Sequence, residues 1–551
     1  MYQGNLTLNI EEIEVHIRTY RSLLKSAGEV RILNLIDSHL TMNSILQEKG
    51  AGTEVDIAAF IYCLLRLPSP MSNVKKIILG QSYSVFEKNG FGTIEKWQEV
   101  AAPGRRRKMH FDGKETLGIY IASVTDVDDV ITLATAFQIE WNKFHDKLQD
   151  TKNVEQKAIE LLDSEDVKRI KNIWGDDYHK FLTAIKFRRV DFTIRLLSGS
   201  YNEYTKATQH WWNIVESEHK NLNLQERPIY FVSSNTHSIT NLLSRFVLAE
   251  EKTLIDFLYR LEDKNLIRLW EGISSGDFLA SRENFLYYIA KKYARINQEI
   301  LKRREKLDRK LGIHYIKASK YLDIDTQVIE LSKLAGIDLD NRLSISTKHL
   351  NKSKALIVNI DYPLGWAAYQ VLTEIGQNVD EIRGIYIMGK AATLTGNVGD
   401  ILLPTTVFDQ HTKNVYAINN VFNPQVFNKI FRTGSVLDMQ KTVSVKGTFF
   451  ENKNIIDYWF KEGYNTIEME SGPYLNSAYE FVYYNRYVEN QFINLTNSPF
   501  ELGIAHYASD TPYSKAKNLG VRNLSYEGVE PTYAISLAII KMIIERETRY
   551  L

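Results

Sequence analysis

Two acidic residues stand where the sequence pattern suggests that a strand ends. Apolar and acidic residues alternate along TIEME (466–470), as in a strand with one buried face, and Gly472-Pro473 ends the pattern just after Glu470. Asp510 closes the run LGIAHYAS. A carboxylate at a strand end can accept hydrogen bonds from two adjacent sugar hydroxyls, and a carboxylic acid in an apolar pocket can keep and donate a proton. These acids could therefore bind a sugar and protonate a leaving group.

Each acid also has an ordinary structural explanation. Glu470 could be a surface acid that caps the turn behind it, and Asp510, which precedes Thr511-Pro512, could be the N-cap of a helix. Glu468 lies one pleat back on the same face as Glu470 and is expected to be structural. The alternation alone does not separate these roles.

A stretch of small residues is the next candidate. Gly389-Lys390-Ala391-Ala392 follows an apolar run, and Gly399-Asp400 comes ten residues after Gly389. We expect a turn here, because small residues after a strand let backbone N–H groups approach an anion or a sugar. Tight packing is the alternative explanation, and Lys390 could be solvated. Phe449 and Phe450 follow a glycine in VSVKGTFFENK and could stack on a base, although such a pair is more often core.

The order of these motifs resembles the nucleoside phosphorylase/nucleosidase superfamily, which includes purine nucleoside phosphorylase, uridine phosphorylase, methylthioadenosine nucleosidase and AMP nucleosidase. That family has a small-residue turn and a Gly-Asp pair, then an EME strand, then Ser-Asp. Here the same order is GKAA…GDILLP (389–404), EMES (468–471) and SD (509–510). The resemblance covers roughly 350–551. It implies a three-layer α/β domain with a mixed central sheet.

The resemblance implies a role for each residue of the sugar side. Glu470 would hold the ribose hydroxyls, and Met469 would pack beneath the sugar. Gly389, Lys390, Ala391 and Gly365 would contact a phosphate, another anion or the sugar. The family's Gly-rich second loop is matched in DYPLG (361–365) only at Gly365, and Asp361 is a candidate for the carboxylate that activates water.

The resemblance also implies how the base is held. Phe450, or less readily Phe449, would stack on it. Asp510 would donate a proton to the purine N7 or hydrogen-bond with it, with Ser509 beside it, and Arg522 would assist Asp510.

The nucleophile is indicated by a departure from the family pattern. Phosphorylases place an arginine two residues before the turn glycine and often a serine or threonine after it, where this chain has Ile387 and Lys390. A lysine cannot reproduce a bidentate phosphate clamp. We therefore expect hydrolysis of a purine nucleoside or nucleotide, with Lys390 facing a 5′-phosphate or another substrate anion. A phosphorylase with inorganic phosphate as co-substrate and a non-catalytic nucleoside sensor are the alternatives. No metal or cofactor is expected.

The elements that must position these residues indicate an α/β protein. Strand–turn–helix patterns begin near residues 117, 229 and 355, and charged helical sequence fills 250–335. We expect a helical region over 1–113, an α/β and helical region of unassigned role over 114–335, and the phosphorylase-like domain over 336–551. The family's first strand is not recognisable just before Ala355. YFVSSNTHS (230–238) could supply it, with 250–335 as an insertion.

Composition bounds the function further. The 551 residues carry 68 Lys and Arg against 67 Asp and Glu, so no overall field recruits nucleic acid or an anionic membrane, although Arg105–Lys108 is a local basic run. The single cysteine, Cys63, suits a reducing cytoplasm. No signal peptide and no apolar run of about 18 residues is found. We expect a cytoplasmic homo-oligomer that binds a small nucleoside or nucleotide and neither nucleic acid nor membrane.

Overall fold

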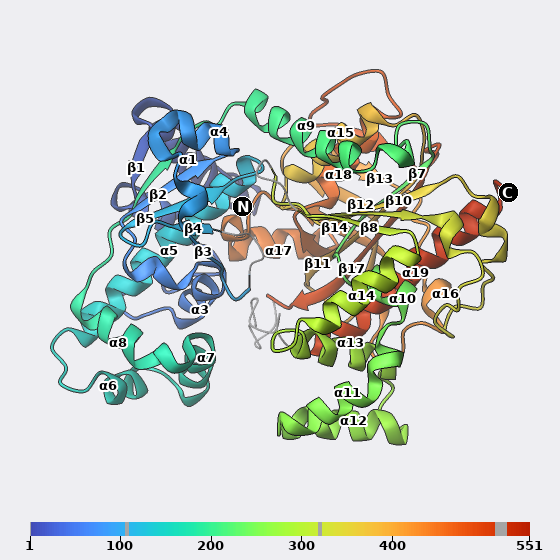
Figure 1. Ribbon diagram of the computed structural model, residues 1–551. Coiled ribbons are helices and arrows are strands. Elements are labelled where there is room, and N and C mark those ends of the chain that lie inside the picture. The colour runs from blue at the N-terminus through green and yellow to red at the C-terminus, as the bar shows by residue number, and fades with distance from the viewer. Residues whose placement is uncertain (1, 105–108, 318–321, 513–525) are drawn as a thin grey trace.

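The chain folds into two lobes that lie side by side (Figure 1). The computed structural model describes residues 2–104, 109–317, 322–512 and 526–551. Each lobe is built on its own sheet, and the chain passes from one sheet to the other between Leu196 and Ile229. The sequence analysis placed its divisions after residues 113 and 335 instead.

The first lobe contains a six-stranded sheet in the order β1-β6-β2-β5-β4-β3. Its strands β2, β5 and β6 run parallel, whereas β1, β3 and β4 join antiparallel at the edges. The strands are β1 (Glu29–Arg31), β2 (Lys76–Gly80), β3 (Gln98–Val100), β4 (Met109–Phe111), β5 (Thr116–Tyr120) and β6 (Thr193–Leu196). The helices are α1 (Tyr2–Ala27), α2 (Ile36–Thr41), α3 (Ile57–Arg66), α4 (Tyr83–Phe86), α5 (Val124–Leu148), α6 (Val154–Leu161), α7 (Ser164–Trp174) and α8 (Tyr178–Phe187).

The second lobe contains a larger mixed sheet that runs β16-β13-β12-β14-β15-β11-β7-β10-β9-β8, with β17 paired to both β11 and β12. Its strands are β7 (Ile229–Ser234), β8 (Ile313–Ile316), β9 (Thr326–Glu330), β10 (Leu356–Asp361), β11 (Ile382–Thr393), β12 (Ile401–Asp409), β13 (Val415–Ala417), β14 (Val436–Ser444), β15 (Tyr464–Glu468), β16 (Phe492–Asn494) and β17 (Glu501–Asp510).

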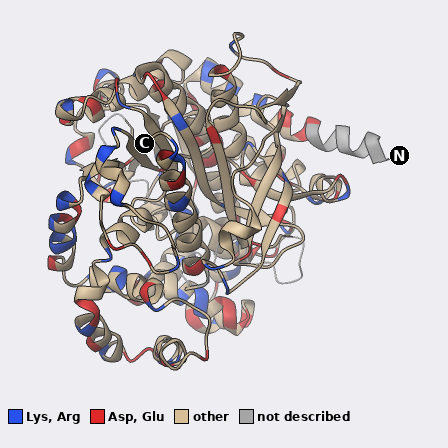
Figure 2. Cartoon of the chain, turned by 90° about the vertical axis from the view of Figure 1, so that its right-hand side faces the viewer, with Lys and Arg blue, Asp and Glu red and all other residues tan. Residues whose placement is uncertain are grey.

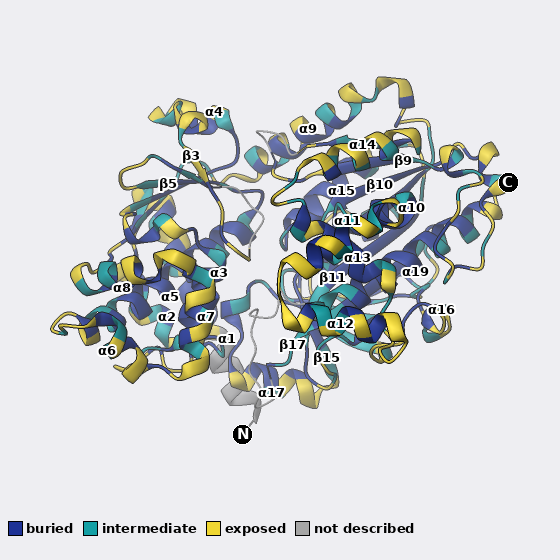
Figure 3. Cartoon of the chain, turned by 60° about the horizontal axis from the view of Figure 1, so that its bottom comes forward, coloured by how far each residue is buried: buried dark blue, intermediate teal, exposed yellow. Residues whose placement is uncertain are grey.

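Helices cover both faces of this larger sheet. One apolar cluster joins α9, α15 and α18 to one face, and another joins α10, α13 and α19 to the opposite face. Figure 3 shows the buried strands between helices whose outer sides are exposed. The helices are α9 (Tyr201–Glu218), α10 (Ser238–Ser244), α11 (Val247–Arg260), α12 (Lys264–Ser275), α13 (Arg282–Tyr293), α14 (Glu299–Lys310), α15 (Ala367–Asn378), α16 (Pro424–Phe427), α17 (Lys453–Lys461), α18 (Ser471–Glu480) and α19 (Val529–Thr548). The predicted α/β class with a mixed sheet is confirmed.

The structure also decides two expectations about individual segments. β7 pairs parallel with β10 and β11, so the stretch 230–234 does belong to the larger sheet, and the residues that follow it up to β10 are inserted between two neighbouring strands. The region over 1–113, expected to be helical, contains the helices α1 to α4 and also the strands β1 to β4. The run KIILG (76–80) is apolar at every position but the first, as in a strand buried on both faces.

The two lobes share a hydrophobic core. One continuous cluster of buried side chains includes Phe60 and Ile61 of α3 in the first lobe and Phe449 and Met469 of the second. Backbone contacts join them as well, because Ile45 N donates to Glu451 O at 2.8 Å. The lobes are therefore packed together as one body.

Charge and hydropathy add little to this arrangement. Basic and acidic residues are interspersed along the helices on the side of the second lobe shown in Figure 2, in keeping with a net charge of +1. Within the described ranges, no helix is both long enough and apolar enough to cross a bilayer. The local basic run 105–108 lies outside the described residues.

Candidate functional site

The larger sheet opens along one side of β11. β7 pairs with β11 from Ile382 to Ile387, whereas β15 pairs with it only at Ala392 and Thr393 and runs in the opposite direction. Neither strand pairs with residues 388–391 between them. Ligands of α/β sheets commonly bind beyond the carboxyl ends of the strands, where neighbouring connections diverge. This opening is therefore the candidate site.

The small-residue stretch lies inside a strand, so the turn expected at Gly389 is wrong. β11 continues to Thr393, and β17 pairs with it in parallel from Gly384 to Ala392. A Cβ atom at Gly389 would lie 2.8 Å from His506 Nδ1, closer than such contacts occur. The glycine is thus required by tight packing on the buried His506 ring. Lys390 lies on the same face of the strand as Tyr386 and Met388, because side chains alternate along a strand.

Glu468 and Glu470 have different surroundings, although they lie two residues apart. Glu468 is the last residue of β15 and is only 4% exposed. Its Oε2 accepts hydrogen bonds from the N–H groups of Glu470 and Ser471 at 2.7 and 2.8 Å, and its Oε1 accepts one from Ser444 Oγ. Glu468 therefore caps the first turn of α18, as a structural residue would.

Glu470 is half-buried in the short connection between β15 and α18. Burial and, after it, the charge of Glu468 raise the pKa of Glu470, whereas a backbone hydrogen bond from Gly365 favours the ionised form. The prediction placed Gly365 and Glu470 in one site, and the structure brings them into contact. A carboxyl group with this raised pKa exchanges a proton near neutral pH, as groups in functional sites often do.

Gly365 is held in place by the first lobe. Its φ of 52° lies in the left-handed region that favours glycine, and an added Cβ would lie 2.6 Å from Thr125 Cγ2 of α5. Thr125 Oγ1 also accepts a hydrogen bond from Trp366 N at 3.0 Å. The start of α5 thus packs against the loop that holds Glu470.

Ser509 and Asp510 end β17 on the other side of β11. Asp510 pairs with Ala392, and Ser509 Oγ donates to Asp510 Oδ2 at 2.7 Å and to the Ala391 carbonyl at 3.4 Å. Asp510 is therefore the end of a strand and not the N-cap of a helix. Since Ala392 has Ile467 of β15 as its other neighbour, Asp510 and the segment leading to Glu470 flank the same residue.

The aromatic pair lies in the core that the two lobes share. Phe449 is 1% exposed and Phe450 3%. The ring of Phe449 packs on His39 and Tyr62 of the first lobe, with centroids 5.7 and 5.6 Å away. This burial favours the packing explanation over a stacking platform for a base. Met469 belongs to the same core.

The first lobe places Tyr62 beside this core, which the sequence analysis did not foresee. Tyr62, on α3, shares a hydrogen bond of 2.9 Å with Thr448 Oγ1, and the Arg66 guanidinium lies 3.5 Å above its ring. Burial raises the pKa of Tyr62, and among nearby charges Asp129 and Asp510 act in the same direction, against Arg66. Tyr62 therefore lies within electrostatic reach of Asp510. Its sequence context, FIYCLLRL, reads only as a buried helix.

Other predicted residues lie at the rim of this arrangement or outside it. Asp361 ends β10 opposite Ser234 of β7, at the same edge of the sheet as the opening. Arg522 lies outside the described residues. Among the residues that are described, no three His, Cys, Asp or Glu side chains gather as a metal ion would require.

Solved structures similar to this chain include enzymes that cleave nucleosides. The 5′-methylthioadenosine/S-adenosylhomocysteine nucleosidase from Neisseria meningitidis, in complex with methylthio-immucillin-A, is 11% identical, with a TM-score of 0.29 over 43% of this chain and 94% of that one. The 5′-methylthioadenosine nucleosidase of Arabidopsis thaliana is 10% identical, with a TM-score of 0.29 over 43% and 89%. A methylthioadenosine phosphorylase from an Antarctic soil metagenomic library is 9% identical, with a TM-score of 0.27 over 42% and 79%. A likeness at these values does not assign a function.

Comparison of the sequence with protein families assigns the chain to a family, although comparison with curated proteins does not. No curated protein matches it. One family model matches residues 32–545, which include the larger sheet, the first sheet apart from its edge strand β1, and the opening along β11. The match thus spans most of both lobes, and the chain belongs to the family described as a family of unknown function, DUF6909.

Proposed function

We propose that this protein cleaves the N-glycosidic bond of a purine nucleoside or nucleotide by hydrolysis. The observation that carries the proposal is the pairing at Ala392, which has Asp510 on one side and the segment leading to Glu470 on the other. Neighbouring strands lie about 4.8 Å apart, so the two flanking backbones are separated by roughly 10 Å. A nucleoside bound between them could touch one acid with its sugar and the other with its base.

Glu470 is the proposed ligand of the ribose. Glu470 follows the end of β15, and its carboxyl group accepts a hydrogen bond from the N–H of Gly365. β15 itself pairs with Ala392, at the end of the stretch of β11 that neither β7 nor β15 pairs with. Ionised, Glu470 can accept hydrogen bonds from both ribose hydroxyls. Its negative charge also opposes the positive charge that develops on the sugar as the bond to the base breaks.

Asp510 is the proposed partner of the base. The departing purine gains negative charge, and a proton or hydrogen bond delivered to its N7 stabilises that charge in the transition state. Ser509 donates to one oxygen of Asp510 and so fixes the orientation of the carboxyl group. Tyr62 is buried, and it lies close enough to Asp510 for the charge of that carboxylate to raise the pKa of the tyrosine. The Tyr62 ring would help to exclude water from this end of the site.

Water is the proposed nucleophile. Ile387, where phosphorylases of the resembling family carry an arginine, is 1% exposed and belongs to the apolar core of the sheet. That position therefore offers no cation to inorganic phosphate. Asp361 is the proposed residue to activate the water, and Lys390 would face an anionic group of the substrate.

The test is a panel of nucleosides and nucleotides, incubated with the protein with and without phosphate, and product identification by mass. Hydrolysis predicts free base and free sugar in both conditions. Asp510→Asn and Glu470→Gln should each lower the rate at least about 100-fold, as expected for a lost general acid or transition-state contact. Glu462→Gln, an exposed change near the same strand, is the control and should keep full activity.

Two outcomes would reject parts of this proposal. Base release that requires added phosphate and yields ribose 1-phosphate would replace the hydrolase with a phosphorylase. Nucleoside binding without turnover above background, unchanged in Asp510→Asn, would identify a binding module instead of an enzyme.

A further inference from the structure

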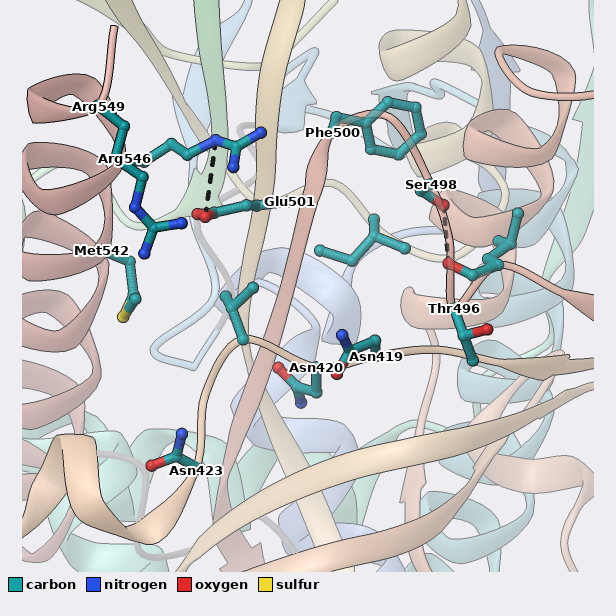
Figure 4. A pocket seen from close by; sticks show the side chains of 13 residues that line it. Asn419, Asn420, Asn423, Thr496, Ser498, Phe500, Glu501, Met542, Arg546 and Arg549 are labelled. Atoms are coloured by element: carbon teal, nitrogen blue, oxygen red, sulfur yellow. Dashed lines mark hydrogen bonds and ion pairs between the residues drawn. The ribbon is translucent and has the colours of Figure 1, made fainter. Parts of the chain in front are cut away.

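A pocket lies at the end of the larger sheet opposite to the candidate site. Its volume is about 430 Å³, and Arg546 of α19 and Arg549, which directly follows that helix, lie on one side of it, across from Asn419 and Thr496 (Figure 4). Glu501, which begins β17, also lines it, whereas Asp510 ends that strand. A strand of ten residues spans about 30 Å, so this pocket is separate from the candidate site.

The charges of this pocket are not balanced. Two guanidinium groups face one carboxylate, and Glu501 Oε2 already accepts a hydrogen bond of 2.8 Å from Tyr386. Arg546 Nε lies 3.6 Å from Glu501 Oε1, too far for a hydrogen bond, and this buried nitrogen has no hydrogen-bond partner among the described residues. Arg549 is exposed and forms no ion pair within the described part of the chain.

A neighbouring arginine shows the contrast. Arg383 donates to Glu381 at 2.9 Å and to Glu547 at 2.7 Å, so its guanidinium is held between two carboxylates. Basic residues near the end of α19 are favourable in any case, because a helix carries partial negative charge at its C-terminus. That effect explains why arginines occur there. The helix dipole does not explain why a cavity lies beside Arg546, whose buried Nε has no hydrogen-bond partner among the described residues.

The remaining walls define what could fit. The polar side includes the exposed amide of Asn419, and Phe500 and Met542 add apolar surface. A volume of about 430 Å³ lies within the range of small-molecule sites. Guanidinium groups bind phosphate and carboxylate through paired, charge-assisted hydrogen bonds.

We propose that this pocket binds a small organic anion, with its phosphate or carboxylate group on Arg546 and Arg549 and its apolar part against Met542 and Phe500. The oxyanion would complete the hydrogen bonding of Arg546 and supply the missing negative charge. This inference does not depend on the proposed nucleosidase activity.

Titration calorimetry on the full chain tests it, with phenyl phosphate and benzoate as the two anionic probes and benzyl alcohol as the uncharged match. We expect at least one anion to bind, the alcohol not to bind, and affinity to fall as salt rises. Arg549→Gln should weaken the binding about 10-fold or more, because it removes charge-assisted hydrogen bonds to the anion. Arg546→Gln should weaken it at least as much.

Two control variants separate this site from others. Arg260→Gln, an exposed arginine on α11, should leave the affinity unchanged. Glu470→Gln should also leave it unchanged, whatever that variant does to nucleoside cleavage. The proposal is rejected if neither anion binds, if benzyl alcohol binds as well as the anions, or if Arg549→Gln binds like the wild type.

Discussion

At the scale of single residues, Glu468 and Glu470 show how two nearby acids acquire different roles. Glu468 accepts hydrogen bonds from two backbone N–H groups and from Ser444, and these bonds tie it to the start of α18. Glu470, in the connection between β15 and α18, accepts one from Gly365. A stability measurement can therefore distinguish a structural acid from a functional one.

Glu468→Gln should destabilise the protein by roughly 1–3 kcal/mol, because the amide nitrogen would face groups that now donate to a buried oxygen. Glu470→Gln should change stability much less, since its carboxyl group makes fewer contacts. Urea denaturation followed by circular dichroism gives both values. Equal losses in the two variants would contradict the distinction.

Glu451 provides a pH prediction at the same scale. Burial raises its pKa to about 8, against a hydrogen bond from Gln410. Because the folded pKa lies above that of the unfolded chain, the folded state binds this proton more tightly. The resulting stabilisation is fully present below about pH 4.5 and is lost as the pH rises through about 8.

Glu451→Gln removes this titration. The variant should match the wild type near pH 4.5 and become more stable than it at pH 8–9, by on the order of a few kcal/mol. Melting temperatures measured at half-unit steps across this range give the comparison. A constant difference at every pH would show that Glu451 does not titrate between these limits.

Single residues of the candidate site could be predicted from the sequence more readily than the side chains that pack around them. The order of GKAA, EMES and SD along the chain was enough to select Glu470 and Asp510, and in the structure Ala392 pairs with Asp510 on one side and with Ile467, three residues before Glu470, on the other. The core position of Phe449 could not be derived in the same way. Its neighbours His39 and Tyr62 lie about 400 residues earlier in the chain, and no local pattern links them.

At the scale of elements, β11 explains why a glycine is needed at position 389. The strand passes over the buried ring of His506, whose Nε2 is 2.9 Å from Ser471 Oγ at the start of α18. The glycine, the histidine and the serine therefore link β11, β17 and α18 beneath the site. The small residues suggested a turn, because the sequence pattern does not show that the His506 ring packs against Gly389.

Gly389→Ala should destabilise the protein by about 1–3 kcal/mol, since the added methyl group would lie 2.8 Å from His506 Nδ1 and the ring is buried. Gly52→Ala is the matched control, with its nearest contact at 3.6 Å, and should change stability by less than about 0.5 kcal/mol. Thermal unfolding of the two variants measures both effects. If Gly389→Ala is as stable as Gly52→Ala, the close approach to His506 is not what requires the glycine.

Periodicity was most informative for elements whose pattern is local. The strand–turn–helix units at β5–α5 and β7–α10 were predicted correctly, because each combines a buried apolar run with polar residues before a helix. The strands within residues 1–113 were missed, since β1 and β3 have three residues each and carry no measurable alternation. Their existence depends on pairing with distant strands, such as β1 with β6.

At the scale of the whole molecule, the first lobe covers the end of the sheet at which Glu470 and Asp510 lie. Thr125 touches the Gly365 loop, Tyr62 bonds to Thr448, and Lys446 forms an ion pair of 2.8 Å with Glu14. The sequence analysis assigned no function to this part of the chain. The contacts show that it packs against the loops around the candidate site.

Removal of residues 1–200 should therefore expose apolar surface and abolish function together. A fragment that begins at Tyr201 retains the larger sheet but uncovers Phe449, Phe450 and Met469, whose burial depends on the first lobe. We expect this fragment to aggregate or to bind a hydrophobic dye strongly, because contiguous apolar patches of this kind are rare on soluble monomers. Size-exclusion chromatography and dye fluorescence measure this. A fragment that stays monomeric, binds no dye and still cleaves a nucleoside would show that the first lobe is dispensable for the site. If the fragment is inactive and activity returns when residues 1–200 are added as a separate chain, the contacts at Thr125 and Tyr62 complete the site.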